Sequence, residues 1–181
     1  MKTRLVTSET TQIPKKIISK GIKYSDKYCK IENLKADFGS FHKDYLLVHY
    51  SKKASIVLVK NNKILMTKQY RLLINKLSLE VPGGALEKKE KPSQAAKREF
   101  LEETGIQCKN LKPLVQYFTA LEYIKNYNYI FFTNKFDIKN IKPNCVWVPL
   151  KKCLKMIKNK KIHDSLSIIS ILSYLSYKKK I

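Results

Sequence analysis

One segment of this chain fixes a strand, a loop and a helix in that order. Between Gly84 and Ile106 the sequence reads GALEKKEKPSQAAKREFLEETGI. Pro92 suits the first turn of a helix, because a residue there has no intrahelical partner for its N–H in any case. Gly105 suits the C-terminal cap. The segment therefore predicts a strand that ends near the glycines, a polar loop, and a helix over residues 93–104.

The predicted helix carries three glutamates on one face, namely Glu99, Glu102 and Glu103. The whole chain has 37 Lys+Arg against 14 Asp+Glu, a formal net charge of +23, yet no lysine lies between Arg98 and Thr104. Like charges three and four positions apart repel. A bound divalent cation removes that cost, and a ligand set of oxygens favours Mg²⁺ or Mn²⁺. We also expect Arg98 and Glu102 to pair. The alternative for this stretch alone is an ordinary glutamate-rich surface helix.

The full spacing of the segment resembles the Nudix box. Five residues separate Gly84 from Glu90, and seven more precede the run Arg98-Glu99-Phe100-x-Glu102-Glu103-x-Gly105-Ile106. The resemblance implies an α/β (α+β) fold, an α/β/α sandwich with a mixed sheet. It also implies hydrolysis of a nucleoside diphosphate linked to another moiety, with Glu90 supporting the site from the loop.

The resemblance assigns a role to each residue of the box. The catalytic residues would be Arg98, Glu99, Glu102 and Glu103. The three glutamates would be metal ligands, together with the backbone carbonyl of Gly83, because a glycine lets the backbone approach an ion closely. Two or three Mg²⁺ (or Mn²⁺) ions would neutralise the pyrophosphate and activate the attacking water.

Two further motifs resemble the ADP-ribose and nucleoside-diphosphate-sugar pyrophosphatase branch. They are QYR at residues 69–71 and EVPGG at residues 80–84. By this resemblance Arg71 would bind the phosphates or the distal sugar of the substrate, since a planar guanidinium grips phosphate at two points. Capping of a strand edge is the alternative for Arg71. Glu80 would either bind substrate or shape its loop.

Two departures from the branch leave the general base open. The region YFTALEYIKNY after the box has no proline, and the loop IKNIKPN has no acidic residue. Glu122, Glu102 or another residue would take the base role, or the metal alone would activate the water. The predicted reaction is hydrolysis of a nucleoside diphosphate sugar, with ADP-ribose cleaved to AMP and ribose 5-phosphate.

Two other functions remain as alternatives. The net charge of +23 favours a Nudix hydrolase that acts on RNA 5′ ends or on dinucleotide polyphosphates. Against an RNA partner, the chain has no basic stripe interleaved with aromatic residues. A non-catalytic nucleotide-binding module is the alternative of another class, although this chain keeps every glutamate of the box.

The sequence predicts a domain in two parts. Residues 1–50 alternate loosely between apolar and polar, which predicts antiparallel strands with turns near Ser25-Asp26 and Gly39-Ser40. By resemblance they belong to the same domain and form a homodimer contact. Residues 51–181 are the predicted Nudix hydrolase domain, and apolar runs about Asn61-Asn62 predict a hairpin there. Tyr24, Tyr28 and Phe38 could stack on adenine, but the expected role of each is in the N-terminal core.

Sequence patterns argue against a membrane-spanning protein and against a zinc site. The N-terminus has no apolar leader region, and no run approaches 18 apolar residues, so we expect a cytoplasmic protein without a membrane span. The four cysteines form no CxxC pair, which predicts reduced thiols rather than a zinc site. The three histidines show no metal-ligand spacing.

Overall fold

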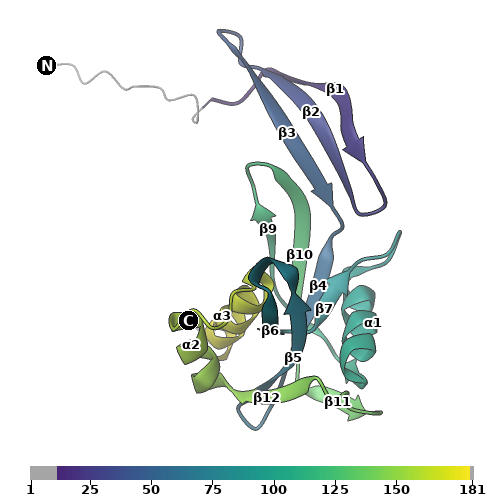
Figure 1. The fold of residues 1–181 in the computed structure, drawn as a ribbon, viewed down its shortest axis with the longest axis vertical. Helices are drawn as coiled ribbons and strands as arrows, with labels where there is room; N and C mark the ends of the chain where they lie inside the picture. Colours follow the sequence, from purple (N-terminus) through teal and green to yellow (C-terminus); the bar gives the residue numbers. More distant parts are fainter. Residues whose placement is uncertain (1–11, 180–181) are drawn as a thin grey trace, which may run out of the picture. The chain divides into compact units, whose positions relative to one another are not determined.

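The structure, a computed structural model, describes residues 12–179 (Figure 1). Within this range the chain divides into two units. The first unit contains residues 12–50 and 120–125, and the second contains residues 51–119 and 126–179. Each unit is described by itself.

The N-terminal alternation folds as an antiparallel meander of three strands: β1 (Lys16–Ser25), β2 (Cys29–Asp37) and β3 (His42–Tyr50). Strand β2 pairs with β1 on one side and with β3 on the other. The turns lie at the two predicted places, where Asp26 N–H donates to Cys29 O and where Gly39 has a φ of 91°. The antiparallel strands and their turns are therefore confirmed.

The aromatic residues of the first unit differ in burial. Phe38 is buried and stacks on Phe41 with ring centroids 4.6 Å apart, as expected of a core residue. Tyr24 and Tyr28 are exposed, so their predicted core role is wrong. The reason is that no other part of the described chain covers strand β1, which is exposed along its whole length. The Tyr24 hydroxyl instead donates to Asp26 at 2.9 Å.

The second unit is built on a mixed sheet. Its strands are β4 (Lys53–Lys60), β5 (Lys63–Arg71), β6 (Lys76–Glu80), β7 (Gly83–Ala85), β9 (Lys112–Ala120), β10 (Ile124–Thr133) and β12 (Cys145–Pro149). Strand β4 pairs in parallel with β10 and antiparallel with β5 and β7. Strand β5 also pairs antiparallel with β6 and with β12, and β9 pairs with β10. The predicted mixed sheet is confirmed.

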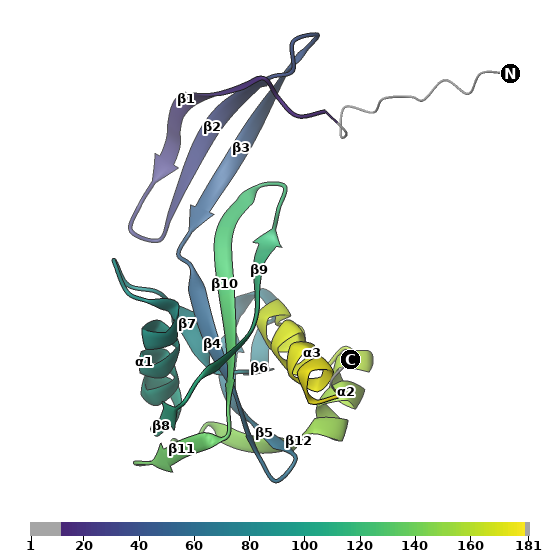
Figure 2. The same ribbon diagram turned by 180° about the vertical axis from the view of Figure 1, so that it is seen from behind.

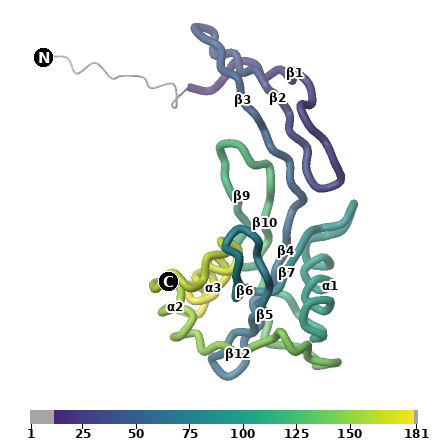
Figure 3. The backbone as a smooth tube through the Cα atoms, viewed as in Figure 1, coloured from purple at the N-terminus to yellow at the C-terminus, as the bar shows by residue number. Residues whose placement is uncertain are grey.

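Two local features explain the path of the chain, which Figure 3 traces. The predicted hairpin is confirmed, because Asn61 and Asn62 both adopt positive φ, as a tight two-residue turn requires. The sequence LSLEVPGG (residues 77–84) predicts a short strand that is stopped by Pro82 and the glycines, and β6 confirms it; the short strand β7, which begins at Gly83, was not predicted. Pro82 has no N–H and the N–H of Val81 bonds to Ser167, so the ladder stops after Glu80.

Some short elements were not predicted. Strands β8 (Ile106–Lys109) and β11 (Lys135–Ile138) form a separate antiparallel pair. A 3₁₀ turn, η2 (Leu72–Ile74), connects β5 to β6 where the sequence indicated only a loop.

Helices cover both faces of the sheet, as Figures 1 and 2 show from opposite sides. Helix α1 (Pro92–Thr104) lies on one face, and α2 (Leu150–Lys158) and α3 (Ser165–Lys179) lie on the other. Alternation along β4 serves both layers. Ile56 and Leu58 share a buried cluster with Phe100 of α1, while Val57 shares one with Ile171 of α3. The predicted α/β/α sandwich is confirmed.

Two exclusions can be compared with the structure. None of the helices within residues 12–179 is long and apolar enough to cross a membrane. The four cysteines, Cys29, Cys108, Cys145 and Cys153, are free in the structure, and Cys108 and Cys153 are buried.

Candidate active site

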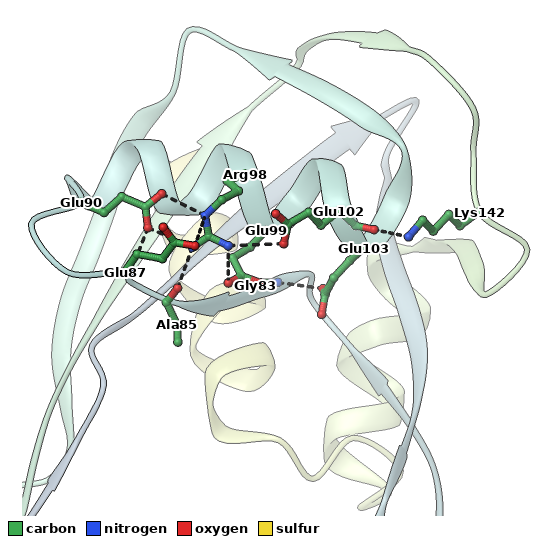
Figure 4. Close-up of polar contacts among 9 residues, drawn as sticks. All are labelled: Gly83, Ala85, Glu87, Glu90, Arg98, Glu99, Glu102, Glu103 and Lys142. Atoms are coloured by element: carbon green, nitrogen blue, oxygen red, sulfur yellow. Dashed lines mark hydrogen bonds and ion pairs between the residues drawn. The ribbon is translucent and has the colours of Figure 1, made fainter. Parts of the chain in front are cut away.

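Helix α1 presents its glutamates beside the glycine pair of β7 (Figure 4). The helix begins at Pro92 and ends at Gly105, whose φ of 72° places it in the left-handed region. Both ends agree with the sequence prediction. Ala96 and Phe100 are fully buried against the sheet. Glu99 and Glu103 lie next to Gly84 and Gly83 of β7.

Both glycines of β7 have close contacts. A β-carbon at Gly83 would lie 2.5 Å from the carbonyl oxygen of Ala54, so no side chain fits there. A β-carbon at Gly84 would lie 2.2 Å from Oε2 of Glu99, so a side chain there would displace the Glu99 carboxylate. The glycines therefore let the Glu99 carboxylate lie directly against the backbone of β7.

Arg98 lies at the centre of the carboxylates. Its Nε and Nη2 donate to the two oxygens of Glu90 at 3.0 and 2.9 Å. Its Nη1 donates to Glu99 at 2.8 Å and to Glu102 at 3.3 Å, which confirms the predicted pairing of Arg98 with Glu102. The bonds from Arg98 lower the pKa of Glu90, and those to Glu90 and Glu99 raise the pKa of Arg98. A further bond from Nη2 to Ala85 O ties the arginine to β7.

This arrangement adds to one sequence-based expectation. We expect a metal ion to offset the repulsion among the glutamates, and in the structure Arg98 offsets part of it. A single positive charge does not offset all of the carboxylates. Glu87 lies 3.9 Å from Arg98, and Glu103 bonds to Gln69 and Gly83 instead of to the arginine. Among residues 12–179, no three His, Cys, Asp or Glu side chains are gathered tightly enough to hold a metal ion. Glu90, Glu99 and Glu102 are therefore turned toward Arg98, while Glu103 is not.

Glu103 lies apart from the arginine. Its Oε1 accepts from Gln69 Nε2 at 2.6 Å, and its Oε2 accepts from Gly83 N–H at 3.1 Å. Burial, with a smaller contribution from the charge of Glu99, raises the pKa of Glu103 despite these hydrogen bonds. A buried carboxylate with a second carboxylate beside it and a glycine backbone next to it suits a divalent cation.

The donor set fits a hard metal ion. Glu99, Glu103 and the Gly83 carbonyl supply only oxygen, as Mg²⁺ and Mn²⁺ prefer. The side chain of Glu102 is 59% exposed and pairs with Arg98, so it is the least enclosed of the three glutamates. Its backbone carbonyl accepts a bond from the Lys142 ammonium (Figure 4). The assignment of all four groups as ligands stays a prediction.

Arg71 and Glu80 form a second charged group. Nε of Arg71 donates to Glu80 Oε1 at 2.8 Å, and Nη2 pairs with Oε2. Burial opposes ionisation of Glu80, but bonds from Arg71 and Ser78 outweigh it and lower the pKa of Glu80. Glu80 therefore holds Arg71 in place. The arginine remains half exposed and lines a pocket of about 310 Å³ with Leu72, His163 and others.

Comparison with known proteins places this site in a family. Residues 49–166 match the model of the NUDIX domain, which covers more than half of the chain. This chain belongs to the NUDIX family. The resemblance found in the sequence is thereby confirmed, and the protein is a Nudix-type pyrophosphohydrolase.

Two curated relatives of this Nudix protein are similar over most of its length. An ADP-ribose pyrophosphatase from Bacillus subtilis (strain 168) is 26% identical over 157 residues, which cover 82% of this chain and 84% of that protein. A methanol dehydrogenase activator from Bacillus methanolicus is 27% identical over 150 residues, covering 78% and 81%.

A solved structure shares the fold. The crystal structure titled as an ADP compounds hydrolase matches with a TM-score of 0.79 at 15% identity. The match covers 94% of this chain and 98% of the other. At this identity it supports the fold of the Nudix protein and nothing beyond it.

The Nudix site includes contacts that the sequence analysis did not assign. Gln69 belongs to the QYR motif, but the sequence did not predict its bond to Glu103. The period of two along β5 was the available signal, because residues 69 and 71 point to the same side of a strand. Lys142 was missed because its loop lies far along the chain. In that loop Lys142 N–H bonds to Thr104 O and Asn140 N–H to Gly105 O, so the loop caps α1.

Proposed function

We propose that this Nudix protein hydrolyses the pyrophosphate bond of a nucleoside diphosphate sugar, and that ADP-ribose is cleaved to AMP and ribose 5-phosphate. The observation that carries the proposal is the placement of Glu99 and Glu103 against the backbone of Gly83 and Gly84, with Arg98 orienting the neighbouring carboxylates. Similarity to the Bacillus subtilis ADP-ribose pyrophosphatase supports the choice of substrate.

The proposed cofactor is Mg²⁺ or Mn²⁺, with two or three ions held by Glu99, Glu102, Glu103 and the Gly83 carbonyl. When bound, such ions neutralise the pyrophosphate and lower the pKa of the attacking water. Arg98 orients two of the ligand carboxylates, and Gln69 orients a third. The exposed Glu102 side chain is suited to act as the general base that takes a proton from the attacking water.

Arg71 is proposed to bind the substrate. Its Nε and Nη2 are engaged by Glu80, so Nη1 is the group that remains for a phosphate or distal sugar oxygen. Gln69 lies on the same side of β5 as Arg71 and bonds to Glu103, so Arg71 is near the carboxylates. Glu80 is proposed to position Arg71.

The substrate is tested by a hydrolysis screen with Mg²⁺ and with chelator. We expect AMP release from ADP-ribose, less turnover of ADP-glucose, GDP-mannose, UDP-glucose and dinucleotide polyphosphates, and none with chelator. Preferred cleavage of 5′-triphosphate RNA would move the assignment to RNA 5′ ends. Binding of ADP-ribose without AMP release would indicate a non-catalytic module.

A homodimer is proposed through the strands of residues 1–50, and the cytoplasm remains the expected compartment. Strands β1 and β3 expose Ile17, Ile22 and Leu46, which are apolar side chains suited to a contact between copies. We expect light scattering to give about twice the chain mass of 21.1 kDa. A mass of one chain at micromolar concentration would contradict the dimer.

A further inference from the structure

A buried hydroxyl joins helix α3 to the segment between β6 and β7. Val81 N–H donates to Ser167 Oγ at 2.8 Å, and Ser167 Oγ lies 2.6 Å from Asp164 Oδ2. An amide N–H can only donate, so the hydroxyl accepts from Val81 and gives its single proton to Asp164. Ser167 and Val81 are both buried, so loss of the hydroxyl leaves the Val81 N–H without a partner.

The cap of α3 holds this hydroxyl in place. Asp164 Oδ2 also accepts the N–H of Ser167 at 2.7 Å, and Asp164 O accepts the N–H of Ile168 at 3.0 Å. These are the bonds of an N-cap residue, which satisfy the free N–H groups of the first turn. One aspartate therefore fixes both the helix start and the direction of the serine hydroxyl.

The segment that Ser167 holds leads directly to the proposed metal site. Glu80 holds Arg71, Pro82 has no N–H to give, and Gly83 N–H donates to Glu103. The N–H of Val81 is the one that reaches α3, on the opposite face of the sheet from α1. The glycine backbone is thus tied to one helix layer through Glu103 and to the other through Ser167.

We propose that Ser167 and Asp164 are positioning residues for the Nudix metal site, because through Val81 they set the place of the Gly83 backbone relative to Glu103. The proposal rests on the proposed function, since it concerns the same metal ligands. Within residues 12–179, no hydrogen bond joins either residue to Glu99, Glu102 or Glu103, whereas Asp164 lines the pocket of Arg71. For Asp164 the readout is therefore Mn²⁺ affinity without substrate. The effect of both residues passes through the backbone of residues 81–83, as outer-shell bonds tune metal sites elsewhere.

The test compares two buried serines of α3. Ser170 is also fully buried, and its Oγ lies 3.3 Å from that of Ser55, so Ser170→Ala removes a comparable bond without touching Val81. For both alanine variants, Mn²⁺ affinity of the substrate-free protein, melting temperature, and kcat and KM for ADP-ribose are measured. We expect Ser167→Ala to weaken Mn²⁺ binding about tenfold and to lower kcat by a similar factor, with KM unchanged. Ser170→Ala should lose stability only.

Two more variants keep the test decisive. Ser167→Thr restores a hydroxyl and should recover Mn²⁺ affinity. If Ser167→Ala does not fold, the half-buried Asp164→Ala replaces it and should also weaken Mn²⁺ binding. Equal Mn²⁺ affinities for the Ser167 and Ser170 variants, beside an active wild type, would overturn this proposal alone. A wild type that neither binds Mn²⁺ nor cleaves ADP-ribose would overturn the proposed function and the positioning role with it.

Discussion

Replacing Glu103 by Gln is expected to lower kcat for ADP-ribose about 10³-fold. Loss of one metal-binding carboxylate removes several kcal/mol of charge stabilisation in the transition state, and about 4 kcal/mol corresponds to that factor. The fold should persist, because a glutamine at position 103 still offers an oxygen to Gln69 or to Gly83 N–H. The NH₂ group of the new glutamine cannot accept a hydrogen bond, so one of these two donors loses its partner. A modest drop in melting temperature is therefore expected.

The measurement is steady-state turnover of ADP-ribose with saturating Mg²⁺, beside a thermal melt. Asp137→Asn is the matched control, because Asp137 is an exposed carboxylate that pairs with Lys109 away from the box. That control should keep wild-type turnover. Near-normal turnover by Glu103→Gln would show that Glu103 is not a metal ligand.

Replacing Arg71 by Ala is expected to raise KM for ADP-ribose about 10- to 100-fold. A charge-assisted contact contributes about 1.5–3 kcal/mol, and each 1.4 kcal/mol is tenfold in affinity. The exposed Leu72 borders the same pocket without a charge, so Leu72→Ala is the matched control for a change in pocket shape. Equal KM values for Arg71→Ala and the wild type would leave Arg71 with a structural role only.

The Arg71 variant has a side effect that a double variant separates. Without Arg71 the buried carboxylate of Glu80 has lost its bidentate partner, which destabilises the fold by about 1–3 kcal/mol. Adding Glu80→Gln removes the unpaired charge and should recover part of that stability, as a coupled pair does. The raised KM should remain, because Nη1 of Arg71 is still absent. Denaturant unfolding and substrate kinetics on the wild type, Arg71→Ala, Glu80→Gln and the double variant check both expectations.

The local elements were predictable because their signals are local. Pro92 and Gly105 delimit α1, and Asn61-Asn62 makes the hairpin turn, since each acts through its own backbone angles. The face shared by Glu99 and Glu103 followed from helical periodicity. The family followed from the spacing of the box.

The remaining features depend on contacts that join distant residues. Whether Gly83 ends one strand or begins another is decided by β4, which pairs with it, and by Ser167, which lies 86 positions beyond Val81. Gln69 and Glu103 are 34 positions apart. Arg98 was expected to meet Glu102 one turn on, but its bonds to Glu90 depend on how the loop before α1 folds back. Periodicity carries no information about such distances.

The most direct test of the central claim is a calorimetric titration of Mn²⁺ into the substrate-free wild type and into Glu103→Gln. The account predicts saturable binding to the wild type and at least tenfold weaker binding to the variant, because the Glu103 carboxylate is one of the proposed metal ligands. Equal binding by the two proteins, or no binding by either, would contradict the claim that these carboxylates hold the metal.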